Sequence, residues 1–268
     1  MGHMEDDRGR HDLRAVFNRA AEDYQRSRPV LPPGLFDDLI YLAGLRPGDR
    51  VIEIGCGTGQ ATVPLAERGL AVTAVELGAE LAAIARRRVA GFPAVEVVTS
   101  SFEDWRPPPG TQAAAVVAVN CLHWIDPELR YAKPHGLLRP GGAMVVAGCQ
   151  WARPADAGRF WFDVQEDYQA AGMEGIPPPP PEQIGSQHLP PGAARYFTEI
   201  AALRYPFQLR FSAGDYLANL GTQSGTQALG EPRRTEFLTR VRHRLDSLAL
   251  SHLTATFVGY LTIGRRRD

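Results

Sequence analysis

Residues 51–59 read VIEIGCGTG, and this stretch decides the fold of the chain. Residues 51–54 are an apolar run typical of a buried strand. Gly55, Gly57 and Gly59 then predict a loop that leads into a helix over residues 60–68. Glycine suits such a junction because it adopts positive φ and lets the backbone approach a ligand closely. The stretch therefore predicts a strand, a ligand-binding loop and a helix in succession.

The spacing of the glycines distinguishes two kinds of ligand. A dinucleotide-binding loop follows the pattern Gly-x-Gly-x-x-Gly, in which the helix N-terminus holds a pyrophosphate. Here Gln60 takes the sixth position, and Glu53 stands two residues before the first glycine, where its carboxylate would repel a phosphate. A ligand that carries an ammonium group and no phosphate fits this loop better.

Strands and helices alternate on both sides of the loop. Apolar runs and turn residues predict strands at 71–75, 95–99, 113–119 and 143–147, and helices at 35–43 and 79–89. Asp126 and Pro127 are a good pair of cap and first helical residue, so another helix is expected to begin at Pro127. Strands this apolar, alternating with helices, indicate an α/β fold with a parallel sheet covered on both faces.

The alternation stops between residues 151 and 195. This stretch holds five consecutive prolines, 177–181, and a group of aromatic residues: Trp151, Phe160, Trp161, Phe162 and Tyr168. Most of these rings are expected to pack in a core, and one or two lining a pocket would imply an apolar or aromatic small molecule. Beyond the stretch, strands are expected at 203–211 and 253–263, with a helix between them at 234–248.

Composition and charge exclude several classes of protein. The chain has 268 residues, of which 44% are hydrophobic and 22% charged, as in globular proteins. Its net charge is -1, so no positive field attracts nucleic acid, and no nucleic-acid partner is expected. The longest apolar run, 113–119, is far shorter than the roughly 20 residues that cross a bilayer, so no membrane partner is expected. The arginine runs at 86–88 and 265–267 are interpreted as a solvated helix face and a solvated tail.

The cysteines and the N-terminus bear on location. Cys56, Cys121 and Cys149 lie in or beside apolar strands and cannot all pair, which favours free thiols in a reducing cytoplasm. The sequence has no Cys-x-x-Cys pair and no metal-ligand spacing of histidines, so no metal is expected. No signal peptide is visible, and residues 1–11 are interpreted as an appended tag with a disordered N-terminus.

The stretch VIEIGCGTG resembles motif I of the class I S-adenosylmethionine-dependent methyltransferases, and further features of that family follow in order. Glu76 ends the next strand, where the family places a carboxylate, and residues 138–142, LRPGG, resemble the turn before the fifth strand. Tyr24 with Arg28, and residues 120–124, extend the likeness over residues 12–150. It is similar to bacterial small-molecule enzymes of the methyltransferase 11 and 25 types. The resemblance implies a Rossmann-like fold: a seven-stranded, mostly parallel sheet with helices on both faces, an antiparallel last strand and a lid insertion.

The resemblance also implies how the chain is divided. A single methyltransferase domain is expected over residues 12–268. Within it, residues 12–45 are N-terminal cap helices, 46–150 the cofactor-binding core, 151–195 a lid or substrate insertion, and 196–268 the strands and helix that complete the sheet.

Family positions that contact S-adenosylmethionine carry over to matching residues. The implied cofactor-binding residues are Tyr24, Arg28, Glu53, Gly55, Cys56, Gly57, Thr58, Gly59, Glu76, Leu77, Ser101, Phe102, Asn120 and Cys121. Glu76 would hold the ribose and Leu77 would flank the adenine, whereas Ser101 stands where many members carry an aspartate for the adenine amino group. Glu53 either contacts the ligand or only orients the loop. Tyr24 and Arg28 either close over the methionine end or are plain surface residues.

His123 follows the fourth strand, whose carboxyl end borders the ligand crevice in an open α/β sheet. A neutral histidine accepts a proton from a hydroxyl or an ammonium group. We interpret His123, together with Tyr24, as catalytic. The alternative is a histidine that only forms a helix-start hydrogen bond above Trp124.

The resemblance implies transfer of a methyl group from S-adenosylmethionine to an O or N atom of a small molecule in specialised metabolism, with S-adenosylhomocysteine as product. Such an in-line displacement needs mainly alignment and a water-poor pocket. The alternative is an enzyme of the same fold that binds the cofactor but catalyses a cyclisation, decarboxylation or hydroxylation. We expect a monomer or a homodimer.

Overall fold

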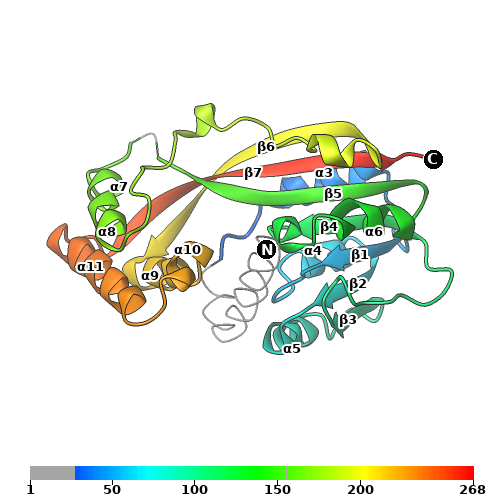
Figure 1. Ribbon diagram of the computed structural model, residues 1–268, viewed down its shortest axis with the longest axis horizontal. Coiled ribbons are helices and arrows are strands. Elements are labelled where there is room, and N and C mark those ends of the chain that lie inside the picture. Colours follow the sequence, from blue (N-terminus) through cyan, green and yellow to red (C-terminus); the bar gives the residue numbers. More distant parts are fainter. Residues whose placement is uncertain (1–27, 155) are drawn as a thin grey trace, which may run out of the picture. The chain divides into compact units, whose positions relative to one another are not determined.

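The computed structural model describes residues 28–154 and 156–268, which form two compact units (Figure 1). We call residues 30–149, 186–205 and 259–268 the sheet unit. Residues 28–29, 150–185 and 206–258 are the aromatic unit. Three long strands have residues in both units: β5 (Leu138–Ala152), β6 (Phe197–Ser212) and β7 (His252–Arg266).

The sheet has seven strands in the order β3-β2-β1-β4-β5-β7-β6. Parallel pairs join β1 (Arg50–Ile54), β2 (Ala71–Glu76), β3 (Val95–Thr99), β4 (Ala113–Val119) and β5. Strand β7 runs opposite to its neighbours β5 and β6 (Figure 1). The predicted Rossmann-like, mostly parallel sheet is confirmed, with its last strand antiparallel.

The centre of the sheet is formed by its most apolar strands. Ile52 of β1 lies in register with Thr73 of β2 on one side and Val116 of β4 on the other. Four of the five residues of β1 and six of the seven of β4 are buried. Burial along whole strands indicates a sheet covered on both faces. The carboxyl ends of β1, β2 and β4 therefore share one edge, to which the loops after these strands belong.

The helices of the sheet unit follow the predicted order, and their starts lie within two residues of the predicted ones. They are α3 (Pro33–Ala43), α4 (Thr62–Glu67), α5 (Ala79–Arg88) and α6 (Leu129–Leu137). The prediction that the last of these begins at Pro127 is wrong. The first helical residue is Leu129, but Asp126 does act as a cap: its carboxylate accepts a hydrogen bond from the Glu128 N–H (2.8 Å), and its carbonyl oxygen accepts one from the Arg130 N–H (2.8 Å).

The interpretation of the arginine runs holds for residues 86–88, which are exposed on α5, but not for Arg265 and Arg266, which are half-buried at the end of β7 instead of lying in a solvated tail. Arg86 donates to the Val97 carbonyl (2.9 Å), and Arg265 donates to the Leu42 and Ala43 carbonyls at the end of α3 (3.0 and 3.1 Å). Arg88 and Arg266 likewise donate to backbone carbonyls. The guanidinium group offers five N–H donors, so it suits carbonyl groups left without partners at helix and strand ends.

The aromatic unit contains five helices among its described residues: α7 (Phe160–Asp163), α8 (Gln165–Ala170), α9 (Ala213–Gly221), α10 (Ser224–Ala228) and α11 (Arg233–Ser247). Its core is built around Trp151, whose ring centroid lies 4.5 Å from that of Phe257 and 6.1 Å from that of Tyr216. Trp161 and Tyr216 are buried, whereas Phe162 is exposed. Most of the aromatic residues after β5 pack in this core or line a cavity beside it.

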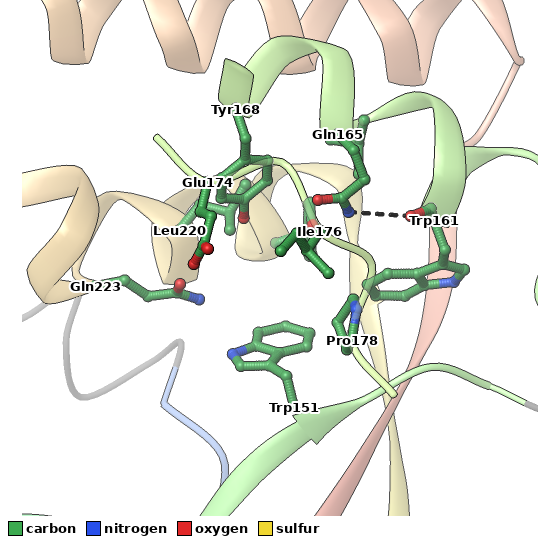
Figure 2. Close-up of a pocket in the computed structure, with 11 residues that line it drawn as sticks. Trp151, Trp161, Gln165, Tyr168, Glu174, Ile176, Pro178, Leu220 and Gln223 are labelled. Carbon is green, nitrogen blue, oxygen red and sulfur yellow. Dashed lines mark hydrogen bonds between the residues drawn. The ribbon is translucent and has the colours of Figure 1, made fainter. Parts of the chain in front are cut away.

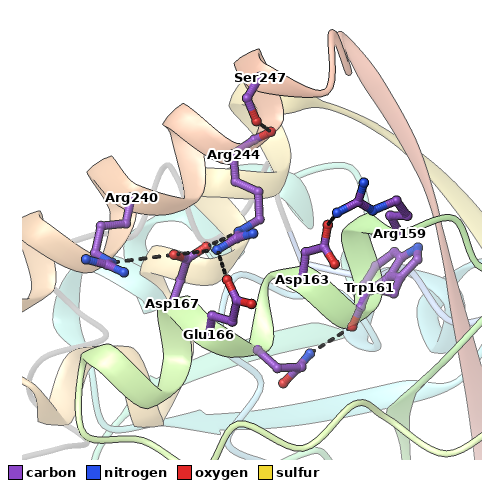
Figure 3. Close-up of polar contacts among 9 residues, drawn as sticks. Arg159, Trp161, Asp163, Glu166, Asp167, Arg240, Arg244 and Ser247 are labelled. Atoms are coloured by element: carbon purple, nitrogen blue, oxygen red, sulfur yellow. Dashed lines mark hydrogen bonds and ion pairs between the residues drawn. The ribbon is translucent and has the colours of Figure 1, made fainter.

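Ion pairs fasten α8 to α11 (Figure 3). The Asp167 side chain is 4% exposed, and its carboxylate accepts hydrogen bonds from Arg244 at 2.6 and 3.1 Å. Arg240 lies 3.4 Å from the same carboxylate, and Glu166 pairs with Arg244 at 3.0 Å. A buried carboxylate is tolerated because these cations and hydrogen bonds offset its desolvation.

Membrane spans and metal clusters are both absent from the described residues. No helix in residues 28–154 and 156–268 has both the length and the apolar content to span a bilayer. In the same part of the chain, no three His, Cys, Asp or Glu side chains gather in a way that could hold a metal ion.

Candidate functional site

The glycine loop between β1 and α4 adopts a backbone that favours glycine. Gly55, Gly57 and Gly59 have φ values of 60°, 57° and 84°. A Cβ atom at Gly55 would lie 3.0 Å from the Cβ of Cys121, closer than ordinary van der Waals contact. Position 55 thus requires glycine both for its φ and for the close approach of the residue that follows β4.

Glu76 at the end of β2 holds the loop through its carboxylate. Its Oε2 accepts a hydrogen bond from the Gly57 N–H and its Oε1 accepts one from the Gly78 N–H, both at 2.8 Å. The side chain is buried. Each carboxylate oxygen has further lone pairs, so Glu76 can accept additional hydrogen bonds from a ligand's hydroxyl groups.

Glu53 is a second buried carboxylate, directly before the loop. The Thr62 hydroxyl donates to its Oε2 at 2.6 Å, which orients the side chain toward the first turn of α4. Burial raises the pKa of Glu53 to about 7, with a smaller upward contribution from Glu76 and an opposing one from Thr62. The orienting role is thus seen in the structure, while contact with a ligand stays a prediction.

Thr58 leaves one polar atom of the loop without a partner. Its Oγ1 is buried and has no hydrogen-bond partner, and its carbonyl oxygen accepts a hydrogen bond from Arg88 at 3.0 Å. The neighbouring Cys56 thiol is also buried, and burial raises its pKa, so it stays protonated. A buried hydroxyl without a partner costs about 1–3 kcal/mol, so this position favours a ligand that bonds to it.

Asn120 and Cys121 follow β4 and contact the neighbouring strands. Asn120 has a φ of 55°, and its Oδ1 accepts a hydrogen bond from the Cys149 N–H at 3.1 Å. The Cys121 thiol donates to the Ile54 carbonyl at 2.9 Å. A Cβ atom at Gly148 would lie 2.2 Å from Asn120 Oδ1, so glycine there leaves room for the asparagine.

His123 lies in a short 3₁₀ turn, Leu122–Trp124, two residues beyond Cys121. Its ring centroid is 4.9 Å from that of Trp124. Arg130 of α6 donates to the carbonyls of His123 (3.0 Å) and Ile125 (2.7 Å) and so fixes the turn. Partial burial, and then the charge of Arg130, lower the pKa of His123, so the imidazole is neutral at pH 7 and can accept a proton.

The turn after β3 holds Ser101 and Phe102, whose contact with the cofactor stays a prediction. The Ser101 hydroxyl donates to Asp104 (2.7 Å) and accepts from the Asp104 N–H (2.9 Å), which caps the turn. Phe102 is buried in the core. Lys133 of α6 donates from its Nζ to the carbonyl oxygens of Phe102, Glu103 (3.2 Å) and Trp105 (2.6 Å).

The sheet unit thus brings most of the predicted site residues to one sheet edge. Direct contacts join the loop to Glu76 and to Cys121, and Leu77 lies half-buried beside Glu76. Arg28 belongs to the aromatic unit, where its guanidinium donates to the Thr222 carbonyl (2.8 Å). Tyr24 lies outside the described residues.

Three supporting residues escaped the sequence analysis: Thr62, Arg88 and Lys133. Each acts across a sequence separation of nine residues or more, and its partner is either a buried carboxylate or a backbone carbonyl. A threonine on the otherwise apolar face of a helix was the available signal for Thr62. Every residue has a backbone carbonyl, so the sequence contains no signal for the carbonyl partners of Arg88 and Lys133.

Part of the chain that carries this site is similar to known proteins. Residues 51–142 match the family described as methyltransferase domain. An uncharacterized methyltransferase of Mycobacterium tuberculosis is 32% identical over 168 residues, which cover 63% of this chain and 63% of that protein. The aligned part of the chain spans 63% of the length of this relative and of two other curated mycobacterial methyltransferases.

Solved structures agree on the fold. A protein from Anaeromyxobacter dehalogenans, described as a candidate type II methyltransferase, superposes with a TM-score of 0.60 at 23% identity and covers 89% of this chain and 97% of its own. A methyltransferase from Thiobacillus denitrificans, solved with S-adenosyl-L-homocysteine, gives a TM-score of 0.51 at 13% identity over 94% of this chain and 98% of its own.

Proposed function

We propose that this chain is a class I methyltransferase that transfers a methyl group from S-adenosylmethionine to an O or N atom of a small molecule. The observation that carries the proposal is the glycine loop held by Glu76, with its N–H groups and a buried carboxylate on one sheet edge. None of the three cysteines forms a disulfide, which agrees with a reducing, cytoplasmic location as part of the proposal.

The residues present fit this cofactor. Two carboxylates, Glu53 and Glu76, lie at the loop and suit a molecule that carries positive charge and ribose hydroxyls. The unpartnered Thr58 hydroxyl offers a further hydrogen bond. S-adenosylmethionine supplies an activated methyl group when it is bound.

The protein's own part in the reaction is then to bind, orient and exclude water. Glu76 accepts hydrogen bonds from sugar hydroxyls while it holds the loop backbone in place. Cys121, which follows β4, packs closely against Gly55 and donates its thiol to the Ile54 carbonyl, which fixes this side of the loop. Alignment of the reacting groups and removal of water are the main demands of methyl transfer.

His123 is our candidate for the group that accepts the acceptor's proton. Its lowered pKa keeps Nδ1 or Nε2 available as a base at neutral pH. Substitution His123→Ala is expected to lower kcat about 100-fold and to leave the affinity for S-adenosylmethionine unchanged, because loss of a general base typically costs this much. A fall in kcat of less than about threefold in this variant would show that His123 is not the base.

The cofactor assignment is tested by Glu76→Ala with Glu67→Ala as control. Glu67 is exposed at the end of α4 and is not one of the proposed site residues. Loss of the Glu76 carboxylate is expected to weaken S-adenosylmethionine binding about tenfold or more in calorimetry, since hydrogen bonds to charged groups contribute about 1.5–3 kcal/mol. Unchanged affinity would contradict the assignment. Cofactor binding without S-adenosylhomocysteine formation would favour a non-methyl-transfer reaction instead.

A further inference from the structure

A cavity of about 150 Å³ lies inside the aromatic unit (Figure 2). Its walls come from the end of β5, from α7, α8 and α9, and from residues 174–178, which lead into the proline run. An apolar cavity of about 150 Å³ is known to hold a benzene-sized molecule. The cavity therefore has room for one compact organic group.

Four aromatic rings form a large part of these walls: Trp151, Trp161, Tyr168 and Tyr216. The Tyr216 ring stands at 87° to both indoles, with centroid distances of 6.1 Å to Trp151 and 6.0 Å to Trp161. Rings set at right angles surround a guest from several sides. Because the face of an aromatic ring carries negative potential, such an arrangement attracts a cation.

The polar atoms of the walls also favour a cation. Gln165 donates its Nε2 to the Trp161 carbonyl (3.0 Å) and Gln223 donates its Nε2 to Asn219 Oδ1 (3.1 Å). One N–H of each amide thus has a protein partner, and each amide oxygen can serve as an acceptor for a cation. Figure 2 shows Glu174 beside Gln223, on the side of the cavity opposite Trp161.

Charge distinguishes this cavity from a neutral apolar one. Among the described residues that line it, Glu174 is the only charged one, and none is basic. Burial raises the pKa of the Tyr168 phenol to about 12 and that of Tyr216 further above its usual range, so both stay neutral. The negative charge of the lining therefore comes from Glu174 alone.

We propose that this cavity binds a compact organic cation, a quaternary or protonated amine whose apolar shell contacts the four rings and whose charge faces Glu174. The proposal concerns binding alone. It holds whether or not the bound amine is the methyl acceptor, and its test does not require methyl transfer.

The first test compares choline with 3,3-dimethylbutan-1-ol, which has the same shape without the charge. Calorimetry on the full chain measures both, and the fluorescence of Trp151 and Trp161 follows the occupancy. Choline is expected to bind about tenfold or more tightly than the alcohol, as cation–π contacts in a desolvated site imply. Equal affinities, or no binding of choline in the millimolar range, would overturn the proposal.

The second test uses matched variants. Glu174→Gln removes the charge at almost constant size, and Glu182→Gln is its control, because Glu182 lies near the proline run but does not line the cavity. The first is expected to weaken choline binding about threefold, as for an exposed carboxylate, and the second to leave it unchanged. Equal effects of the two substitutions would contradict the role of Glu174.

The aromatic walls are tested at Trp151. Trp151→Leu is expected to weaken choline binding about tenfold, whereas Trp151→Phe, which keeps an aromatic face, is expected to weaken it less. Thermal unfolding of each variant shows that the fold is retained. If both variants lose affinity equally while folded, the rings act only as apolar wall, and the cation assignment fails.

Discussion

The glycine-loop site and the aromatic cavity are built from different kinds of groups, the first from backbone and the second from side chains. The loop site is made largely of backbone: three glycines with positive φ, and two N–H groups held by the Glu76 carboxylate at the end of β2. The cavity is made of side chains that come from several separate segments. A backbone site is specified within a few consecutive residues, whereas a side-chain site depends on how distant segments pack. The comparison predicts that the two sites fail in different ways when they are perturbed.

The largest effect is expected from Arg244→Ala in the aromatic unit. Removal of Arg244 leaves the Asp167 carboxylate buried with only Arg240, at 3.4 Å, to offset its desolvation. Breaking a buried pair costs about 3–5 kcal/mol in free energy of unfolding, and we expect about 3 kcal/mol here by chemical denaturation. Because Asp167 shares α8 with two cavity residues, choline binding should fall as well, while S-adenosylmethionine binding should not.

The matched control is Arg159→Ala. Arg159 pairs with Asp163 at 3.2 Å, but its side chain is 83% exposed (Figure 3). An exposed pair of this kind contributes about 0–1 kcal/mol. If the two substitutions cost the same, the α8–α11 contact does not depend on the burial of Asp167, and the cavity is less dependent on side-chain contacts than we infer.

The next effect concerns pH and the loop site. Glu53 has a pKa of about 7 in the fold against 4.5 ordinarily, so the folded protein holds a proton that the unfolded chain releases. This group's contribution to stability is present below pH 4.5 and is lost as pH rises toward 7. Linkage gives about 1.4 kcal/mol per unit of pKa difference, hence a loss of about 3 kcal/mol across this range.

The measurement is the pH dependence of unfolding for the native chain and for Glu53→Gln. The variant cannot titrate at this position, so the fall between pH 4.5 and 7 should be smaller in it by the amount that Glu53 contributes. Identical pH profiles would show that Glu53 keeps an ordinary pKa and that the loop site is more solvated than its geometry indicates.

The smallest effect is the difference between two glycine substitutions. Gly110→Ala introduces a Cβ into open space at a φ of 77°, so its cost measures backbone strain alone. Gly55→Ala has the same kind of strain and also crowds Cys121 at 3.0 Å. We expect Gly55→Ala to cost about 1 kcal/mol more in free energy of unfolding, as overpacking does. Equal costs would mean that Cys121 moves aside freely and that the close approach does not restrict position 55.

The sequence predicted the backbone-built part well because its signals are local. The strands at 95–99 and 113–119 have the predicted bounds, and the positive φ values fall at the three glycines of the loop. Glu76 was placed correctly at the end of β2, since the strand period and the loop fix where a strand ends. These features depend on neighbours in the chain, which a sequence displays directly.

The rest could not be predicted because it depends on tertiary partners. The aromatic residues from Trp151 to Tyr168 indicated a core or a pocket. Their spacing did not show that the ring of Tyr216, which comes from α9, would stand at right angles to the indoles of Trp151 and Trp161. The buried Asp167 was likewise invisible, because an aspartate inside a short helix is ordinarily exposed. Its burial follows only from the arginines of α11, far along the chain.

Lys133 has a consequence for covalent chemistry. It is the only lysine in the 268 residues, and its amine is held by three carbonyl oxygens of the turn after β3. Reagents that acylate primary amines therefore find a single lysine side chain, and they react with it only when that turn opens. The acylation rate of Lys133 therefore reports how often the turn after β3 opens. Mass spectrometry can measure this rate without any substitution in the chain.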